Sequence, residues 1–133
     1  MISQLGFYSL VFGILFSIFI IYQSSKSIIS NDLILKSKIY HSIFLQLFFT
    51  VFSFLCLVAA FLKSDFSNVT VFNNSHTSKP IFYKISGVWG NHEGSLLLWL
   101  LVLIFFLLLF VGIIKLKFYI VLVDFLTSVK RQI

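Results

Sequence analysis

The side chains best suited to chemistry in this chain lie between Trp89 and Trp99, where a polar patch meets the start of a long apolar stretch. Asn91, His92 and Glu93 follow one another there and are flanked by glycines. Ionisable groups next to hydrocarbon are costly and usually have a task. The patch therefore predicts a surface that faces a ligand or a partner, made of Lys84, Trp89, Asn91, His92, Glu93 and Trp99.

The same patch also allows a purely structural interpretation. Tryptophans anchor chains at membrane–water interfaces, and Asn91 is a favourable N-cap. Glu93 would then lie in the first helical turn, where the helix dipole favours a carboxylate. On a helix that starts at Asn91, a stripe is predicted from the spacing of Trp89, His92, Leu96 and Trp99. Both interpretations are consistent with the sequence.

Residue spacing argues against several kinds of catalytic or metal site. His92-Glu93 is not followed by a second histidine four residues later, so it is not a zinc-protease motif, and His41 and His76 are distant in sequence. Cys56 lies in the middle of an apolar stretch, and no nucleophile triad or phosphate-binding glycine loop is present. We therefore predict no catalytic residue and no metal site. An anionic cofactor would be attracted by Lys84 and His92 but opposed by Glu93, which leaves the balance open.

The elements that must position this patch are membrane-spanning helices. The 133 residues are 59% hydrophobic and 11% charged, with a mean hydropathy of +1.06, which is too apolar for a soluble domain. We predict an all-α integral membrane protein whose residues 1–133 form a single membrane domain. Scattered polar residues in the first two spans, such as Ser9, Gln46 and Ser53, are expected to make helix–helix contacts. The predicted spans are 5–22, 43–62 and 95–114, each long enough to cross about 30 Å of hydrocarbon.

Two segments are predicted to lie outside the spans. Residues 63–94 form an outer loop, and between Ser64 and Ile85 their composition favours turns and extended backbone over helix. Residues 115–133 are apolar, but they are short for a span and contain Asp124. We expect them to form an interfacial amphipathic helix, with a truncated fourth span as the alternative.

The distribution of basic residues predicts the topology. The formal net charge is +6, and seven basic residues fall on one side of the predicted spans against three on the other. The N-terminus and residues 63–94 are therefore expected outside, and the C-terminus inside. No basic face with base-reading side chains is present, so nucleic acid is not an expected partner. The seven are Lys26, Lys36, Lys38, Lys115, Lys117, Lys130 and Arg131, and the three are Lys63, Lys79 and Lys84.

Residues 54–99 resemble the N-terminal region of the CcmF family, the large membrane subunit of the cytochrome c haem lyase. The resemblance rests on Trp89-Gly90-Asn91-His92-Glu93-Gly94-Ser95, continued by Leu96-Leu97-Leu98-Trp99, with Tyr83-Lys84-Ile85-Ser86 upstream. Over residues 1–53 only the hydrophobic pattern agrees.

The resemblance implies a role in attaching haem to apocytochrome c on the outer side of the mitochondrial inner membrane or, alternatively, the bacterial plasma membrane. It implies as partners the remaining CcmF-like chain or chains, other cytochrome c maturation proteins, apocytochrome c and membrane lipid. Family members present haem on a tryptophan-rich outer segment, ligate it with paired outer histidines and hold a haem b with histidines inside the bundle. This sequence has no such tryptophan-rich segment, and none of its three histidines matches a family haem ligand.

We therefore expect no cofactor bound by this chain alone, and haem only in the assembled complex. The resemblance implies a non-catalytic subunit or split N-terminal fragment of the lyase that contributes scaffold and outer surface. The alternative is a CcmF-derived accessory subunit of a respiratory-chain complex with no maturation activity.

Overall fold

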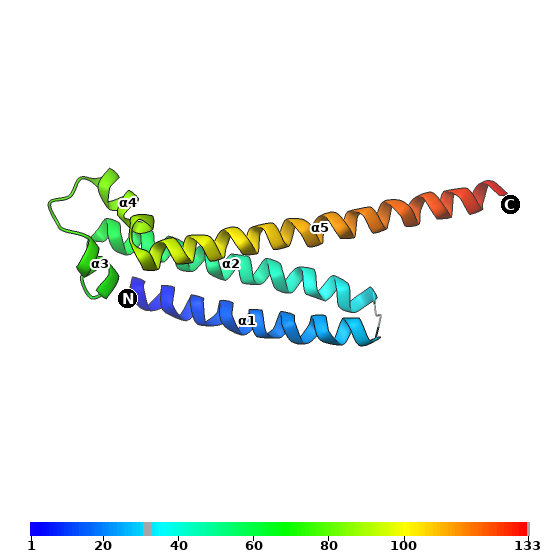
Figure 1. Ribbon diagram of the computed structural model, residues 1–133, viewed down its shortest axis with the longest axis horizontal. Coiled ribbons are helices and arrows are strands. Elements are labelled where there is room, and N and C mark those ends of the chain that lie inside the picture. Colours follow the sequence, from blue (N-terminus) through cyan, green and yellow to red (C-terminus); the bar gives the residue numbers. More distant parts are fainter. Residues whose placement is uncertain (31–32, 133) are drawn as a thin grey trace.

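Three long helices and two short ones make up the chain. The computed structural model describes residues 1–30 and 33–132 (Figure 1). Within those ranges every regular element is a helix, which confirms the predicted all-α architecture. The elements are α1 (Ile2–Ser30), α2 (Leu33–Lys63), α3 (Val69–Asn74), α4 (Ile81–Gly90) and α5 (His92–Gln132).

Three stretches of helix are long and apolar enough to cross a membrane: Ile2–Ser27, Lys38–Lys63 and His92–Ile114. They contain the predicted spans 5–22, 43–62 and 95–114. The N-terminus lies at the end of the bundle that carries α3 and α4, and the C-terminus lies at the opposite end (Figure 1). Ser3 Oγ donates a hydrogen bond of 3.2 Å to Asp65, which links the start of α1 to the segment after α2.

Helices α1 and α2 form an antiparallel pair joined by polar contacts within an apolar surface. Ser9 Oγ donates to the Phe49 carbonyl at 2.7 Å, and Ser53 Oγ donates to the Gly6 carbonyl at 2.9 Å. The side chain of Gln46 donates to Ser17 Oγ. Small and polar residues that let helices approach closely are typical of membrane helix pairs. The expected role of these residues in helix–helix contact is confirmed.

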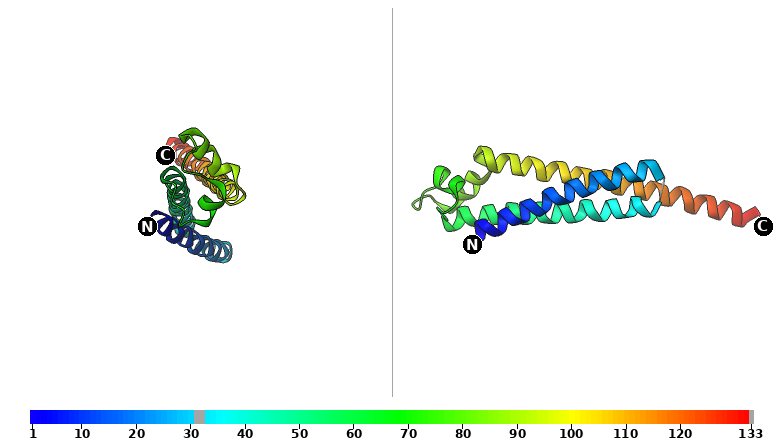
Figure 2. Two further views of the ribbon diagram at one scale, coloured as in Figure 1. Left: turned by 90° about the vertical axis from the view of Figure 1, so that its left-hand side faces the viewer. Right: turned by 90° about the horizontal axis from the view of Figure 1, so that it is seen from below.

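Helix α5 packs along α2 and is the least buried of the three spans. Gly112 faces the ring of Tyr40, so the two helices stay close near the start of α2. At 41 residues α5 is about 61 Å long, assuming a rise of 1.5 Å per residue. It runs as one rod past the ends of α1 and α2 (Figures 1 and 2). Residues 115–132 are helical, as predicted, but they continue α5 without a break and do not form a helix of their own; their interfacial placement stays a prediction, and Ile133 lies outside the described residues.

The predicted outer loop, residues 63–94, is also partly wrong, because it contains α3 and α4. Local caps and tertiary packing explain the difference. Asn68 Oδ1 accepts the N–H of Thr70 at the start of α3. The Pro80 carbonyl accepts the N–H groups of Tyr83 and Lys84 in the first turn of α4. Val71 of α3 and Val88 of α4 are fully buried with Ala60 and Phe61 of α2. Apolar packing thus makes these short segments helical despite their composition.

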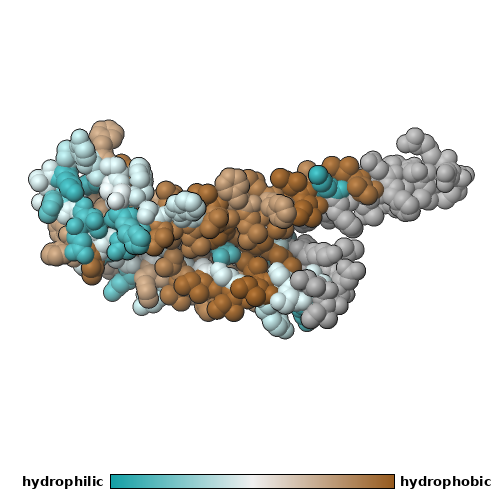
Figure 3. Space-filling model, in the orientation of Figure 1, coloured by the Kyte–Doolittle hydropathy of each residue, from teal (hydrophilic) through white to brown (hydrophobic). Residues whose placement is uncertain are grey.

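The surface follows this arrangement. Hydrophobic residues cover the long helices, and hydrophilic residues gather at the end formed by α3, α4 and their connections (Figure 3). The polar patch singled out in the sequence lies at this end, where α4 meets α5.

Candidate functional surface

The junction between α4 and α5 is organised by the side chain of Asn91. Its amide nitrogen donates to the carbonyls of Gly87, at 2.7 Å, and Val88, at 2.9 Å, near the end of α4. Its amide oxygen accepts the N–H of Gly94 at 2.6 Å in the first turn of α5. The predicted N-cap is therefore confirmed, and the same residue also closes the preceding helix. An N-cap alone contributes roughly 0.5–2 kcal/mol.

Two glycines allow the helices to approach at this corner. A Cβ on Gly94 would collide with the carbonyl oxygen of Val88, so only glycine fits without movement. Gly87 packs against the ring of Phe61, with 3.5 Å between a Cβ built on Gly87 and the nearest ring carbon. Neither glycine was singled out from the sequence. The available signal was the position of Gly94, three residues after an N-cap and directly after an acidic residue.

His92 and Glu93 project from the first turn of α5 into an unoccupied, exposed region. Both are exposed, and within the described part of the chain neither side chain has a hydrogen-bond or ion-pair partner. Glu93 lies in the first turn of α5, as predicted, where the helix dipole stabilises its charge. This pair can therefore donate, accept or pair with a charge on another molecule without breaking a contact inside the chain.

The two tryptophans that flank the pair are also exposed. Trp99 is 69% exposed and lies two turns into α5, on the same side as His92 and Leu96. Trp89 is 47% exposed, but it belongs to α4. The predicted single stripe from Trp89 to Trp99 is wrong, because the helix is interrupted at Asn91.

Lys84 lies apart from this pair and has a structural contact. Its Nζ donates to Ser64 Oγ at 2.7 Å, which ties α4 to the end of α2. Ser64 has a left-handed φ of 52°, and its N–H and that of Asp65 bond back to the carbonyls of Phe61 and Ala60. This is the Schellman arrangement that ends a helix. A cation at a helix C-terminus is favourable, so this contact stabilises the junction.

Asp65 links the same end of α2 to α1. The hydrogen bond from Ser67 Oγ, at 2.6 Å, is the main cause that lowers the pKa of Asp65, although desolvation opposes it. Ser3 adds a weaker contribution in the same direction. The carboxylate is therefore ionised at neutral pH and accepts hydrogen bonds from Ser67 and Ser3 at the end of the bundle that carries α3 and α4.

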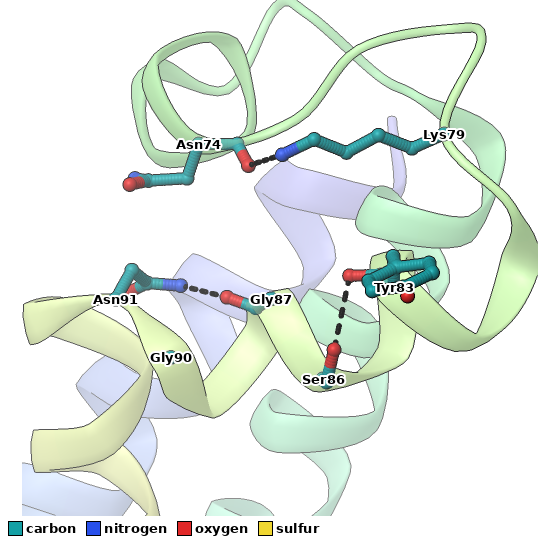
Figure 4. A pocket seen from close by; sticks show the side chains of 7 residues that line it. All are labelled: Asn74, Lys79, Tyr83, Ser86, Gly87, Gly90 and Asn91. Carbon is teal, nitrogen blue, oxygen red and sulfur yellow. Dashed lines mark hydrogen bonds between the residues drawn. The ribbon is translucent and has the colours of Figure 1, made fainter.

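An open hollow of about 410 Å³ lies between α4 and the segment after α3 (Figure 4). Lys79 Nζ, at its edge, donates to the carbonyl of Asn74 at 3.0 Å, and Ser86 Oγ donates to the carbonyl of Tyr83. Asn91 is the one predicted surface residue that lines it. The polar groups around the hollow are thus largely used by backbone contacts.

Side chains that commonly bind metal ions are dispersed in the part of the chain that the structure describes. No group of three histidine, cysteine, aspartate or glutamate side chains comes together in ranges 1–30 and 33–132. His76 follows α3 and His92 begins α5, and both are exposed, whereas His41 lies near the start of α2.

Comparison with known proteins gives the family. The cytochrome c-type biogenesis protein CycK of Rhizobium meliloti is 42% identical over 106 residues, which are 80% of this chain and 16% of that protein. The cytochrome c-type biogenesis protein CcmF of Haemophilus influenzae is 36% identical over 104 residues, 75% of this chain and 15% of that protein. The chain belongs to the CcmF family.

A plant protein is also similar. The "Probable cytochrome c biosynthesis protein" of Daucus carota is 40% identical over 58 residues, 41% of this chain and 10% of that protein. No protein-family model and no solved structure matches the chain. The CcmF-family chain spans about one-sixth of the length of the first two relatives, and with three long apolar helices it is a multi-pass membrane protein.

Proposed function

We propose that this CcmF-family chain is a non-catalytic membrane component of a cytochrome c haem lyase. It contributes helical scaffold and part of the outer surface on which haem is attached to apocytochrome c. The observation that carries this proposal is the exposed His92–Glu93 pair at a corner fixed by Asn91, whose two side chains make no hydrogen bond or ion pair with the described residues. The relatives, named as cytochrome c-type biogenesis proteins, support this general role.

The geometry supports a role in docking. The flanking tryptophans add apolar area beside a charged carboxylate and an imidazole, and aromatic residues next to polar ones are common at protein interfaces. Two hydrogen-bonded contacts hold the helices that carry this surface. Lys84 bonds Ser64, and Asn91 bonds the carbonyls of Gly87 and Val88. Haem enters the proposal as cargo of the assembled complex, and its ligands are supplied by other parts of that complex.

The proposed location is the membrane in which c-type cytochromes mature. This is the plasma membrane in bacteria, where two of the relatives occur, or the mitochondrial inner membrane. The outer end with α3 and α4 faces the side where apocytochrome c is found, in agreement with the lysine distribution. The other partners are the remaining CcmF-like chain or chains and other maturation proteins.

The test replaces the exposed pair and measures mature cytochrome c. A hydrogen bond to a charged group is worth about 1.5–3 kcal/mol, and each 1.4 kcal/mol is about tenfold in affinity. If docking limits maturation, His92→Gln and Glu93→Gln should each lower haem-stained c-type cytochrome roughly tenfold. The matched control is His76→Gln, another exposed histidine at the same end, which should leave the level unchanged.

Immunoblots of the membrane fraction must show equal amounts of all variants. A normal level of mature cytochrome c in the double variant His92→Gln, Glu93→Gln would contradict the proposal. Purification of the tagged chain in mild detergent should also recover a CcmF-like partner, and recovery should fall for the double variant but not for His76→Gln.

A further inference from the structure

The first turn of α4 exposes three large apolar side chains. Phe82 is 83% exposed, Tyr83 is 68% exposed and Ile81 is 64% exposed. The opposite side of the same helix is engaged: Val88 is buried, Gly87 packs on Phe61 and Lys84 bonds Ser64. Helix α4 therefore has one face against α2 and an exposed apolar first turn, whose Tyr83 also borders the open hollow between α4 and the segment after α3.

The depth of α4 along the bundle can be fixed from its contacts. Gly87 and Val88 pack on Phe61, which lies inside the stretch Lys38–Lys63 that is apolar enough to cross a membrane. Figures 1 and 2 show α4 beside the last turns of α2 and not beyond them. At about 1.5 Å per residue, the 26 residues of that stretch cover about 39 Å, more than the roughly 30 Å of hydrocarbon. With that stretch centred on the hydrocarbon, the last turns of α2, and α4 beside them, would fall at the level of the lipid headgroups.

The residues at this level suit a lipid surface. Aromatic side chains with a polar tip, such as that of Tyr83, prefer the interface. Lys63 ends α2 and Lys79 precedes α4, so both supply positive charge near this turn, and lysine side chains can extend toward lipid headgroups. A water-exposed helix would leave Ile81 and Phe82 hydrated at a cost of about 1.5–3 kcal/mol for each large side chain.

We propose that the first turn of α4, with Ile81, Phe82 and Tyr83, is inserted into the headgroup region of the membrane and anchors the outer end of the chain. The occupant of this apolar face is membrane lipid. This inference does not depend on a role in haem attachment. It can hold or fail whether or not the proposed function is correct.

The experiment measures the depth of a single tryptophan at position 82. The full chain carrying Trp89→Phe, Trp99→Phe and Phe82→Trp is reconstituted in phosphatidylcholine–phosphatidylglycerol vesicles. Brominated lipids that carry bromine near the headgroup or deep in the acyl chain quench nearby tryptophan, and iodide quenches tryptophan in water. The control is Thr77→Trp in the same background, because Thr77 is exposed in the connection between α3 and α4.

The expected result is blue-shifted emission for Phe82→Trp, with strong loss of intensity from the shallow brominated lipid and little from iodide. Thr77→Trp should behave in the opposite way. Tyr83→Trp in the same background provides a second position on this turn and should match Phe82→Trp. Iodide quenching of both without quenching by brominated lipid would overturn the proposal and would indicate that α4 faces water, free for a protein partner.

Discussion

Gly94 and Asn91 together let two helices meet in a tight corner. The Asn91 side chain satisfies backbone groups on both sides of the corner, two carbonyls of α4 and one N–H of α5. Unsatisfied buried backbone groups would cost about 1–3 kcal/mol each. This arrangement works because Gly94 has no Cβ where the Val88 carbonyl lies. The orientation of His92 and Glu93 follows from this corner.

Gly94→Ala should destabilise the protein by about 1–3 kcal/mol or more, because the added methyl group must displace the backbone of α4. The protein in mild detergent is unfolded by heating or by titration with dodecyl sulfate, and circular dichroism monitors the loss of helix. The matched control is Gly90→Ala, four residues earlier, where a Cβ meets nothing within 4 Å. Alanine is the better helix former by about 1 kcal/mol, so Gly90→Ala should cause no loss. Equal destabilisation by both changes would contradict the steric explanation.

At the scale of elements, α1 and α2 pack closely against each other, whereas α5 is mostly exposed. Polar contacts join α1 to α2 at four levels, the fourth between Ser42 and Gln23, and Phe49 stacks with both Phe12 and Phe16. Helix α5 is held at its start by the corner at Asn91 and along its length by packing on α2, and it leaves most of its surface exposed. Such a surface suits contact with lipid or with further helices of an assembly.

Gly6→Ala tests the closeness of the α1–α2 pair. A Cβ on Gly6 would lie 2.9 Å from the Cβ of Cys56, which cannot move without its backbone. We expect destabilisation by about 1–3 kcal/mol, measured by the same detergent unfolding. Gly13→Ala is the control on the same helix and face, because its Cβ would lie 3.6 Å from Thr50 Oγ1, an ordinary contact. An equal loss for Gly13→Ala would mean that helix flexibility, and not the contact with α2, determines the cost.

The long elements could be predicted from the sequence, because hydrophobic length alone identifies them. The short ones could not. Helix α4 contains Gly87 and several aromatic or β-branched residues, which are poor helix formers, and it is stabilised by contacts with Phe61 and Ser64 that are distant in sequence. The unbroken course of α5 through residues 115–132 was missed because this stretch is short for a span and contains Asp124, whereas a helix can continue past the hydrocarbon without a break.

At the scale of the whole molecule, the candidate surface could be predicted in part. The location of His92 and Glu93 at the start of the third span follows from the N-cap signal at Asn91, which is a local property. The separation of Trp89 onto another helix and the bond between Lys84 and Ser64 depend on how α4 folds back on α2. Tertiary contacts of this kind leave no periodic pattern in a single sequence.

The orientation of the bundle in the membrane is predicted only from the distribution of basic residues along the sequence. The fold places the N-terminus at the end that carries α3 and α4 and the C-terminus at the opposite end. One labelled residue at each end therefore determines the topology. In a Cys56→Ser background, His76→Cys should react with a membrane-impermeant maleimide added outside. Lys117→Cys, at the opposite end, should react only after the membrane is permeabilised. Both positions are exposed, so accessibility depends on the side of the membrane. The reverse labelling pattern would place the His92–Glu93 pair on the inner side. The topology predicted from the positive-inside rule and the proposed docking of apocytochrome c would then both be wrong.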